Sequence, residues 1–291
     1  MSSASGIVVV DKPPEWTSHD VVGRLRRLAG TRKVGHAGTL DPMATGVLVV
    51  GVNRATRLLG HLMLAEKEYV ATIRLGESTT TDDAEGESVA LESAAHLELD
   101  EIARAVGAFV GDIAQVPSSV SAIKVDGKRA YARVRSGETV ELEARPVRVD
   151  RFDVTGVRTV GEFVDVDVTV VCSSGTYVRA LARDVGSALG VGGHLTMLRR
   201  TRVGGFGIDQ ARTLDQLAER FDMVDLHDAA RGAFPVYELR SDQATDVRFG
   251  RALTSTTLGH DGPVALFDGP EFLALYEQSD ADARAVAVFV G

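Results

Sequence analysis

The chain has 291 residues, a net charge of −9 and 44% hydrophobic residues, which suits a globular protein with one large and one small domain. A single cysteine, Cys172, excludes an internal disulfide and a multi-cysteine zinc site, and the seven histidines lack paired ligand spacing, so we expect no metal. No apolar run reaches the length of a membrane span, and the N-terminus does not resemble a signal peptide, so we expect no membrane association and a cytoplasmic location.

The first segment predicts a strand followed by a helix. Residues 7–10 form an apolar run, and the two prolines at 13 and 14 end it. Ser18 is a candidate cap for a helix over residues 20–29, and Gly30 is a typical stop. A glycine-rich loop over residues 35–42 comes next, followed by a predicted buried strand at 46–50 and a helix at 55–64.

The middle of the chain mixes strands and helices. Residues 68–75 and 163–172 predict strands, and residues 99–109 and 176–189 predict helices. Because the order shows no regular βαβ alternation, we expect an α+β fold around a mixed, largely antiparallel sheet. Beyond about residue 234, short apolar runs punctuated by glycine predict a small strand-rich appendage, so we divide the chain into domains at 1–230 and 231–291.

Charge is unevenly distributed along this acidic chain. Acidic residues are concentrated in residues 61–110 and in the C-terminal part, whereas basic clusters occur at Arg24, Arg26, Arg27, Arg32 and Lys33, at Lys124, Lys128 and Arg129, and at Arg199, Arg200 and Arg202. An RNA-binding face requires local positive potential and not a positive total. For any one cluster alone, solvated surface charge is the simpler interpretation.

The stretch GHAGTLDPMATGVLVVG, residues 35–51, holds the main candidate for chemistry. Asp41 lies in a glycine-lined loop before a buried strand, and a carboxylate there can be held rigidly and act as a nucleophile. A lone Asp-Pro pair more often starts a turn. What favours a catalytic role is that the stretch resembles the G-H-x-G-T-L-D-P motif of the bacterial tRNA pseudouridine(55) synthases, the TruB family.

Other stretches resemble the same family in the same order. They are DKP at 11–13 with Thr17-Ser18, KEY at 67–69, QVPSSVSAIKVDGKRAY at 115–131, CSSGTYVRALARDVG at 172–186 and GHLTMLRRT at 193–201. The resemblance covers about residues 6–210. Pro14-Glu15, Ser118 and Val120 depart from the family pattern in loops around the core.

The resemblance implies a pseudouridine synthase catalytic fold, followed by a small C-terminal RNA-binding domain of the PUA type. It implies catalytic roles for Asp41, for Arg179 as the arginine that holds the aspartate, and for Tyr69 as the residue that stacks on the target base. It further implies that Tyr177 and Leu198 line the uracil pocket. A core tyrosine and a surface arginine remain the alternatives for Tyr69 and Arg179.

The remaining implied contacts are with RNA. His36 matches a histidine that fills the space left in the T loop when the base is flipped out. Lys12 is a candidate contact either to the aspartate loop or to the RNA backbone. The cluster of Arg199, Arg200 and Arg202 is a candidate phosphate contact. Whether Asp41 attacks C1′, attacks the base or removes a ribose proton stays open.

The expected activity is therefore isomerisation of uridine 55 in the T arm of tRNA, without a cofactor, an obligate protein partner or a need to oligomerise. Two other readings are weighed against it. A noncatalytic RNA-binding or RNA-folding protein would not need Asp41, Arg179 and Tyr69 together. A guide-RNA-dependent synthase subunit fits poorly with the short chain and its lack of long basic tails.

Overall fold

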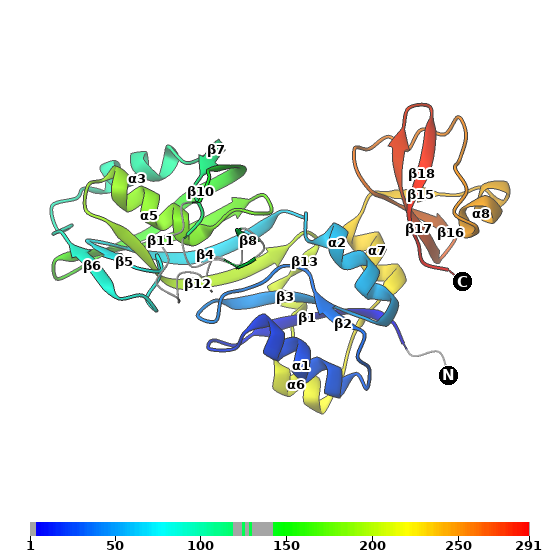
Figure 1. Cartoon of the computed structure of the whole chain (residues 1–291), viewed down its shortest axis with the longest axis horizontal. Coiled ribbons are helices and arrows are strands. Elements are labelled where there is room, and N and C mark those ends of the chain that lie inside the picture. Colours follow the sequence, from blue (N-terminus) through cyan, green and yellow to red (C-terminus); the bar gives the residue numbers. More distant parts are fainter. Residues whose placement is uncertain (1–3, 119–123, 126–127, 130–141, 291) are drawn as a thin grey trace. The chain divides into compact units, whose positions relative to one another are not determined.

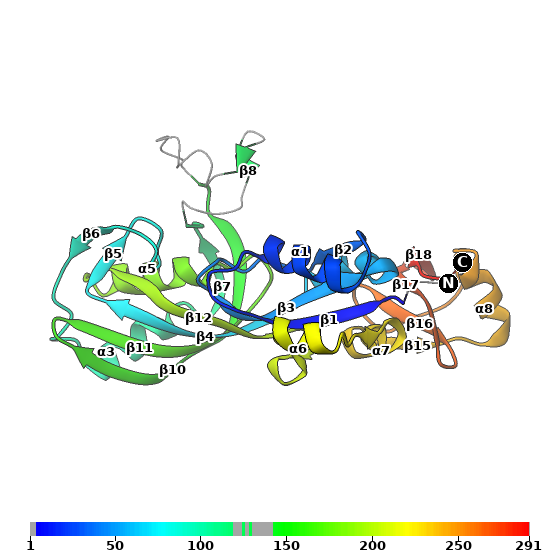
Figure 2. The same cartoon turned by 90° about the horizontal axis from the view of Figure 1, so that it is seen from below.

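The chain folds into two compact units in the computed structural model, which describes residues 4–118, 124–125, 128–129 and 142–290 (Figures 1 and 2). Unit 1 comprises Met1–Pro42, Gly46–Leu64 and Arg202–Gly291, and unit 2 comprises Met43–Thr45 and Ala65–Thr201. No helix within the described ranges is long and apolar enough to cross a membrane.

Unit 1 contains an antiparallel group of strands in the order β14–β1–β3, with β2 also paired to β3. Their bounds are Gly6–Lys12 for β1, Val34–His36 for β2, Thr45–Val52 for β3 and Val224–Asp225 for β14. The strands predicted at 7–10 and 46–50 are thus confirmed. Both are rich in valine and almost completely buried, as expected for strands covered on both faces.

Helix α1, Ser18–Leu28, packs Val21 and Leu25 into the core beside β1 and β3. The prediction that Ser18 caps this helix was wrong. Thr17 is the N-cap and forms a reciprocal capping box with Asp20. Both residues can cap, but the Ser18 hydroxyl is buried and bonds the backbone of Leu40 instead.

The single helix predicted over 55–64 is divided in the structure. A 3₁₀ helix, η1, spans Asn53–Leu58, and a short α-helix, α2, spans Leu59–Leu62. Asn53 adopts a positive φ of 55°, and the Thr56 hydroxyl donates to its carbonyl at 2.7 Å. A side chain that occupies a backbone acceptor in this way competes with regular α-helical bonding.

The remaining elements of unit 1 follow residue 202. They are β13 (Phe206–Gly207), η2 (Ile208–Gln210), α6 (Leu214–Glu219), α7 (Leu226–Ala233), β15 (Val236–Glu238), α8 (Ser241–Arg248), β16 (Val264–Asp268), β17 (Glu271–Ser279) and β18 (Asp282–Val288). Strands β15–β16–β17–β18 form a separate four-stranded sheet with its own apolar cluster, against which α8 packs. The strand-rich C-terminal appendage is confirmed, while a boundary between 230 and 231 stays a prediction.

Unit 2 is built on the strand order β12–β4–β11–β10–β7, with antiparallel pairing throughout β4, β11, β10 and β7. The bounds are β4 Lys67–Leu75, β5 Glu77–Thr79, β6 Ser88–Leu91, α3 Leu99–Gly107, β7 Gly111–Gln115, β8 Lys124–Val125, β9 Lys128–Arg129, β10 Arg145–Val160, β11 Phe163–Cys172, α5 Val178–Ala188 and β12 Gly193–Val203. Helix α3 packs on β10, and α5 packs on β4 and α3. The expected α+β fold with a largely antiparallel sheet is confirmed.

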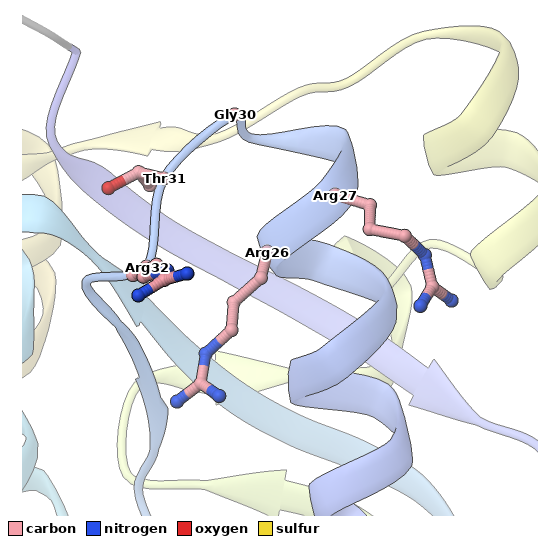
Figure 3. A pocket seen from close by; sticks show the side chains of 5 residues that line it. All are labelled: Arg26, Arg27, Gly30, Thr31 and Arg32. Atoms are coloured by element: carbon pink, nitrogen blue, oxygen red, sulfur yellow. The ribbon is translucent and has the colours of Figure 1, made fainter.

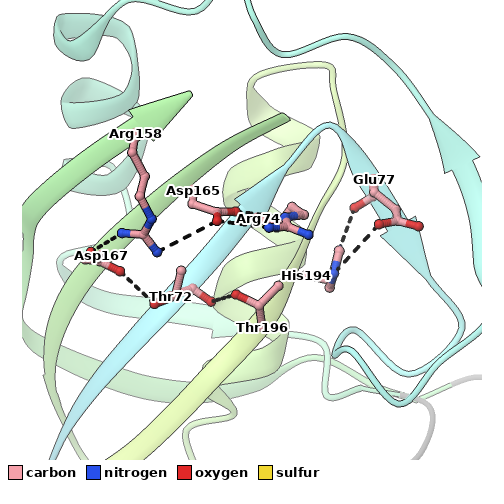
Figure 4. A network of polar contacts seen from close by, with 8 residues as sticks. All are labelled: Thr72, Arg74, Glu77, Arg158, Asp165, Asp167, His194 and Thr196. Atoms are coloured by element: carbon pink, nitrogen blue, oxygen red, sulfur yellow. Dashed lines mark hydrogen bonds and ion pairs between the residues drawn. The ribbon is translucent and has the colours of Figure 1, made fainter. Parts of the chain in front are cut away.

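Polar side chains tie neighbouring strands of unit 2 together (Figure 4). Arg74 on β4 makes two hydrogen bonds to Asp165 on β11, at 2.8 and 2.9 Å. Asp167 accepts from Thr72 at 2.6 Å and from Arg158, and these bonds lower the pKa of its carboxyl group below the usual value. The network therefore fixes the register of β4 against β11.

Helix α5 approaches another backbone segment so closely that only glycine fits at one position. A Cβ atom on Gly186 would lie 2.2 Å from the carbonyl carbon of Gly192 and 2.3 Å from the nitrogen of Gly193. Neither atom belongs to a flexible side chain, so the backbone itself would have to move. This contact sets how the end of α5 meets the start of β12.

We predict that Gly186→Ala lowers the free energy of unfolding by about 1–3 kcal/mol through overpacking. Gly107→Ala at the end of α3 is the matched control, because its added Cβ would have no atom within 4 Å apart from its chain neighbours and the backbone of its own helix. That change should instead stabilise by up to about 1 kcal/mol, the usual preference for alanine in a helix. Chemical denaturation of both variants measures the difference, and equal stabilities would contradict the close approach.

Candidate active site

Asp41 lies in a loop that leaves β2 and leads to β3. The pairing of these strands continues past His36, where the Ala37 amide donates to the Val49 carbonyl at 2.9 Å. Gly38 then adopts a φ of 98°, a conformation that favours glycine. The glycine-rich loop predicted from the sequence is confirmed, and Asp41 is half-buried within it.

The residues on both sides of Asp41 are held by hydrogen bonds from unit 1. The Ser18 hydroxyl accepts from the Leu40 amide at 2.9 Å and donates to the Leu40 carbonyl at 3.2 Å. The Pro42 carbonyl accepts from the Glu15 amide at 2.9 Å and from Lys12 Nζ at 3.1 Å. The loop backbone is therefore fixed immediately before and after the carboxylate.

Lys12 has a fully buried side chain at the end of β1. Its ammonium group donates to the carbonyls of Pro13, Trp16 and Pro42 at 2.9, 2.6 and 3.1 Å. Of the two contacts considered for Lys12, the structure contains the one to the aspartate loop. Its burial leaves no exposed surface for a contact with an RNA backbone.

His36 ends strand β2, where it pairs with Val50 of β3. Its ring meets the ring of His19 edge-on, with 5.7 Å between the centroids. His19 is exposed on the first turn of α1, so the two histidines connect the Asp41 loop to the surface of that helix.

Arg179 lies in the first turn of α5 and is 5% exposed, so it is not a surface arginine. Its Nη1 donates to the Thr81 carbonyl at 2.9 Å and lies 3.2 Å from Asp83 Oδ2. The Asp83 carboxylate is also buried and accepts from the Thr81 hydroxyl and the Glu85 amide. A buried guanidinium is thus oriented by a buried carboxylate.

Asp83 is a site residue that sequence reasoning missed. Asp83 lies outside the stretches in which the family resemblance was found, so no role was predicted for it. Asp82 pairs with Arg183 at 3.2 Å, and burial raises the pKa of its carboxyl group. Two adjacent carboxylates therefore bind different arginines of α5, which the linear motif does not reveal.

Tyr177 immediately precedes α5, so the helix predicted from residue 176 begins at Val178. The Gln115 side chain bonds both backbone groups of Tyr177: Oε1 accepts from its amide at 2.8 Å, and Nε2 donates to its carbonyl at 3.1 Å. Gln115 is buried, and its amide locks the start of the helix that carries Arg179. This positioning role was not predicted.

Tyr69 on β4 and Leu198 on β12 are both buried, at 7% and 6% exposure. Each therefore contributes to the packing of unit 2, whatever else it does.

Cys172 is also buried, and burial raises the pKa of its thiol to about 11, so the thiol stays protonated near neutral pH. Cys172 is thus a small buried residue of the unit 2 core.

The three clustered arginines of β12 and its end do not share one environment. Arg200 is 1% exposed, which does not fit the expected phosphate contact. Arg199 and Arg202 are half-exposed, with Arg199 donating to the Thr45 hydroxyl and Arg202 to the Gly204 carbonyl, both at 3.3 Å. Neighbouring residues of a strand point to opposite faces, so the cluster could not present all its charges together.

Comparison with known proteins gives the family. Residues 26–178 match the family model of the N-terminal domain of the TruB family pseudouridylate synthases. Residues 179–240 match the model of the tRNA pseudouridylate synthase B C-terminal domain, and residues 234–290 match the model of the C-terminal part of tRNA pseudouridine synthase II. The chain belongs to the TruB family of pseudouridylate synthases.

The similar proteins span nearly the whole chain. The tRNA pseudouridine synthase B of Arthrobacter sp. (strain FB24) is 60% identical over 98% of this chain and 96% of its own length. That of Thermobifida fusca (strain YX) is 58% identical over 99% of both. Among solved structures, an H/ACA RNP bound to a substrate RNA containing 2′-deoxyuridine has a TM-score of 0.75 at 25% identity, covering 98% of this chain and 85% of that one.

We predict that Asp83→Asn lowers both turnover and stability. The substitution removes the charge opposite the buried Arg179, and breaking a buried ion pair from one side costs about 3–5 kcal/mol. Asp82→Asn is the matched control, because Asp82 is the adjacent carboxylate and pairs with the more exposed Arg183. Urea denaturation and single-turnover rates measure both effects. Equal losses in the two variants would contradict a special role for Asp83.

Lys67 predicts a pH dependence of stability. Burial, assisted by the charge of Arg200, lowers its pKa from 10.5 to about 8. The unfolded chain then binds this proton more tightly, so the free energy of unfolding should rise from about pH 8 to about pH 10.5, by up to about 3 kcal/mol.

The Lys67→Met variant should lose that rise and be more stable than the parent near pH 7, where the parent must bury a charged ammonium. Lys33→Met, which removes an exposed lysine, should retain the rise. Denaturant midpoints measured between pH 7 and pH 10.5 provide the comparison. If the stability of the parent falls or stays constant between pH 7 and pH 10.5, and Lys67→Met shows the same pH dependence, Lys67 does not have a lowered pKa.

Proposed function

We propose that the chain converts uridine to pseudouridine at position 55 in the T loop of tRNA. The observation that carries the proposal is the placement of Asp41 in the motif loop, with the backbone of Leu40 and Pro42 fixed by Ser18 and Lys12. The 60% identity to a protein named tRNA pseudouridine synthase B supports the same substrate class.

The proposed reaction is an isomerisation that needs no second substrate. The bond from N1 to C1′ breaks, the uracil turns, and C5 bonds to C1′ while C5 loses a proton and N1 gains one. A carboxylate that is oriented and shielded from water suits each of the three steps open to Asp41. The flipped nucleotide must also be held while it is detached.

The surrounding residues receive roles that fit their positions. We assign Arg179, oriented by Asp83, to the electrostatics of the catalytic carboxylate. Tyr69 is assigned to stacking on the base, with Tyr177 and Leu198 lining the uracil pocket. His36 is assigned to the T loop. Lys12 acts through the Asp41 loop and does not contact the substrate, because its ammonium is buried on three carbonyls.

RNA backbone contacts are proposed for Arg199 and Arg202, whose side chains are half-exposed. Arg200 is assigned to the interior of unit 2, where it affects the pKa of Lys67. The C-terminal residues 231–291 are proposed as an RNA-binding domain of the PUA type, supported by their match to the family's C-terminal model.

We further propose a monomer that acts in the cytoplasm without an obligate protein partner or a cofactor. Two sequence identities support action without a partner. The chain is 60% identical to a protein named tRNA pseudouridine synthase B, but only 26% identical to the similar chain in the structure of the archaeal box H/ACA sRNP Nop10–Cbf5 complex. The greater similarity favours a stand-alone enzyme over a guide-RNA-dependent subunit.

We predict that Asp41→Asn abolishes pseudouridine formation while tRNA binding and folding persist, because the amide is similar in size but cannot ionise. Asp261→Asn, which neutralises an exposed carboxylate of unit 1, should keep full activity. The experiment incubates each purified variant with unmodified tRNA and maps pseudouridine by position. Product at position 55 from a sequence-verified Asp41→Asn protein, or product only elsewhere in the tRNA from the parent, would contradict the proposal.

A further inference from the structure

Two hollows lie along the exposed side of α1 in unit 1. The first, of about 440 Å³, is lined by Glu15, Trp16, His19, Asp20, Gly23 and Arg27. The second, of about 670 Å³, is lined by Arg26, Arg27, Gly30, Thr31 and Arg32 (Figure 3). Because Arg27 lines both, they form one continuous surface, which we call the α1 face.

The second hollow carries only positive charge. Figure 3 shows Arg26 and Arg27 projecting from the end of α1 and Arg32 from the turn that follows. In the described part of the chain, no carboxylate forms an ion pair with any of the three, whereas the exposed Arg220 and Arg248 pair with acids. In a chain with a net charge of −9, this is a local concentration of positive potential.

Helix stabilisation explains only part of this arrangement. Cations in the last turn interact favourably with the helix C-terminus, which applies to Arg26 and Arg27. Arg26 also donates to the Val34 carbonyl at 3.3 Å. Arg32 lies beyond the helix and is exposed, so neither reason applies to it.

The first hollow offers an aromatic ring on a fixed backbone. Trp16 is 37% exposed, although its carbonyl accepts from the buried Lys12 ammonium at 2.6 Å. Lys12 binds Pro42 as well, so the backbone of Trp16 is anchored to the residue that follows Asp41. An exposed aromatic ring beside a basic surface is typical of proteins that stack on unpaired bases.

We propose that the α1 face binds the RNA strand that flanks the target nucleotide, an inference that rests on the proposed function. Trp16 stacks on an unpaired base, while Arg27 and Arg32 bind backbone phosphates. The acids Glu15 and Asp20 at the Trp16 end repel phosphate and leave that end to an uncharged base. The charges along the α1 face thus direct an unpaired base to the Trp16 end and the backbone phosphates to the arginine end.

The length of α1 sets the spacing of these contacts. Ser18 at its N-terminal end bonds Leu40, next to Asp41, and the arginines lie at its C-terminal end. A helix of 11 residues is about 16 Å long, which corresponds to about five stacked nucleotides. The phosphates bound by Arg27 and Arg32 are therefore several nucleotides from the one at Asp41.

Intrinsic fluorescence tests the stacking contact directly, because Trp16 is the only tryptophan in the chain. The Asp41→Asn protein is titrated with unmodified tRNA while filter retention measures binding independently. We expect quenching of the emission that follows the retention curve. Full retention with unchanged emission would overturn this inference alone. Absence of retention would overturn the proposed function, and this inference with it.

Substitutions test the phosphate contacts in the otherwise unaltered chain. Arg27→Gln and Arg32→Gln should each weaken tRNA binding and reduce the slope of log affinity against log salt by about 1. Trp16→Ala should weaken binding by roughly tenfold or more, and Trp16→Phe should recover most of the loss.

Arg220→Gln is the matched control, because this arginine of unit 1 is also exposed but pairs with Asp222 at 2.9 Å. It removes the same charge and should leave the salt slope unchanged. Slopes for Arg27→Gln and Arg32→Gln equal to that of Arg220→Gln would overturn the phosphate contacts. A loss in Trp16→Phe as large as in Trp16→Ala would overturn the stacking role.

Discussion

A buried ammonium group at Lys12 is the constraint on which the candidate site depends. Removing a charged group from water costs several kcal/mol unless hydrogen bonds replace the lost hydration. The carbonyls of Pro13, Trp16 and Pro42 supply those bonds by converging on one point. The end of β1, the start of α1 and the Asp41 loop are thereby coupled, and the position of the aspartate depends on keeping this buried charge hydrogen-bonded.

Unit 2 solves a related problem with ion pairs. Arg179 and Asp83 are buried together, so each makes the burial of the other tolerable, and the Thr81 carbonyl accepts a further guanidinium hydrogen bond. Arg200 is buried as well, and desolvation together with its charge lowers the pKa of Lys67 to about 8. Unit 2 therefore buries one cation beside a carboxylate, at Arg179, and another with a lowered pKa, at Lys67.

The sequence predicted the regular elements well and the tertiary contacts poorly. The strand at 163–172 was predicted at its observed bounds, because valines in a β-rich run leave little choice of structure. Thr17 and Ser18 could both cap a helix, and only the distant Leu40 decides between them. Asp83 and Arg179 lie far apart in the sequence, so neither local propensity nor motif spacing reveals their pairing. The catalytic role predicted for Asp41, in place of an ordinary Asp-Pro turn, came from family resemblance and not from periodicity.

The net charge of an acidic protein does not indicate which part of its surface binds RNA. A better indicator is whether each exposed arginine forms an ion pair with a carboxylate. Exposed arginines such as Arg220, Arg231 and Arg248 lie within salt-bridge distance of carboxylates, which largely cancels their field beyond about a Debye length. At the end of α1, no described carboxylate pairs with Arg27 or Arg32, so their potential extends into solvent. The many acids of the chain then sharpen this contrast, since they repel a polyanion from the rest of the surface and leave few places where phosphates can approach.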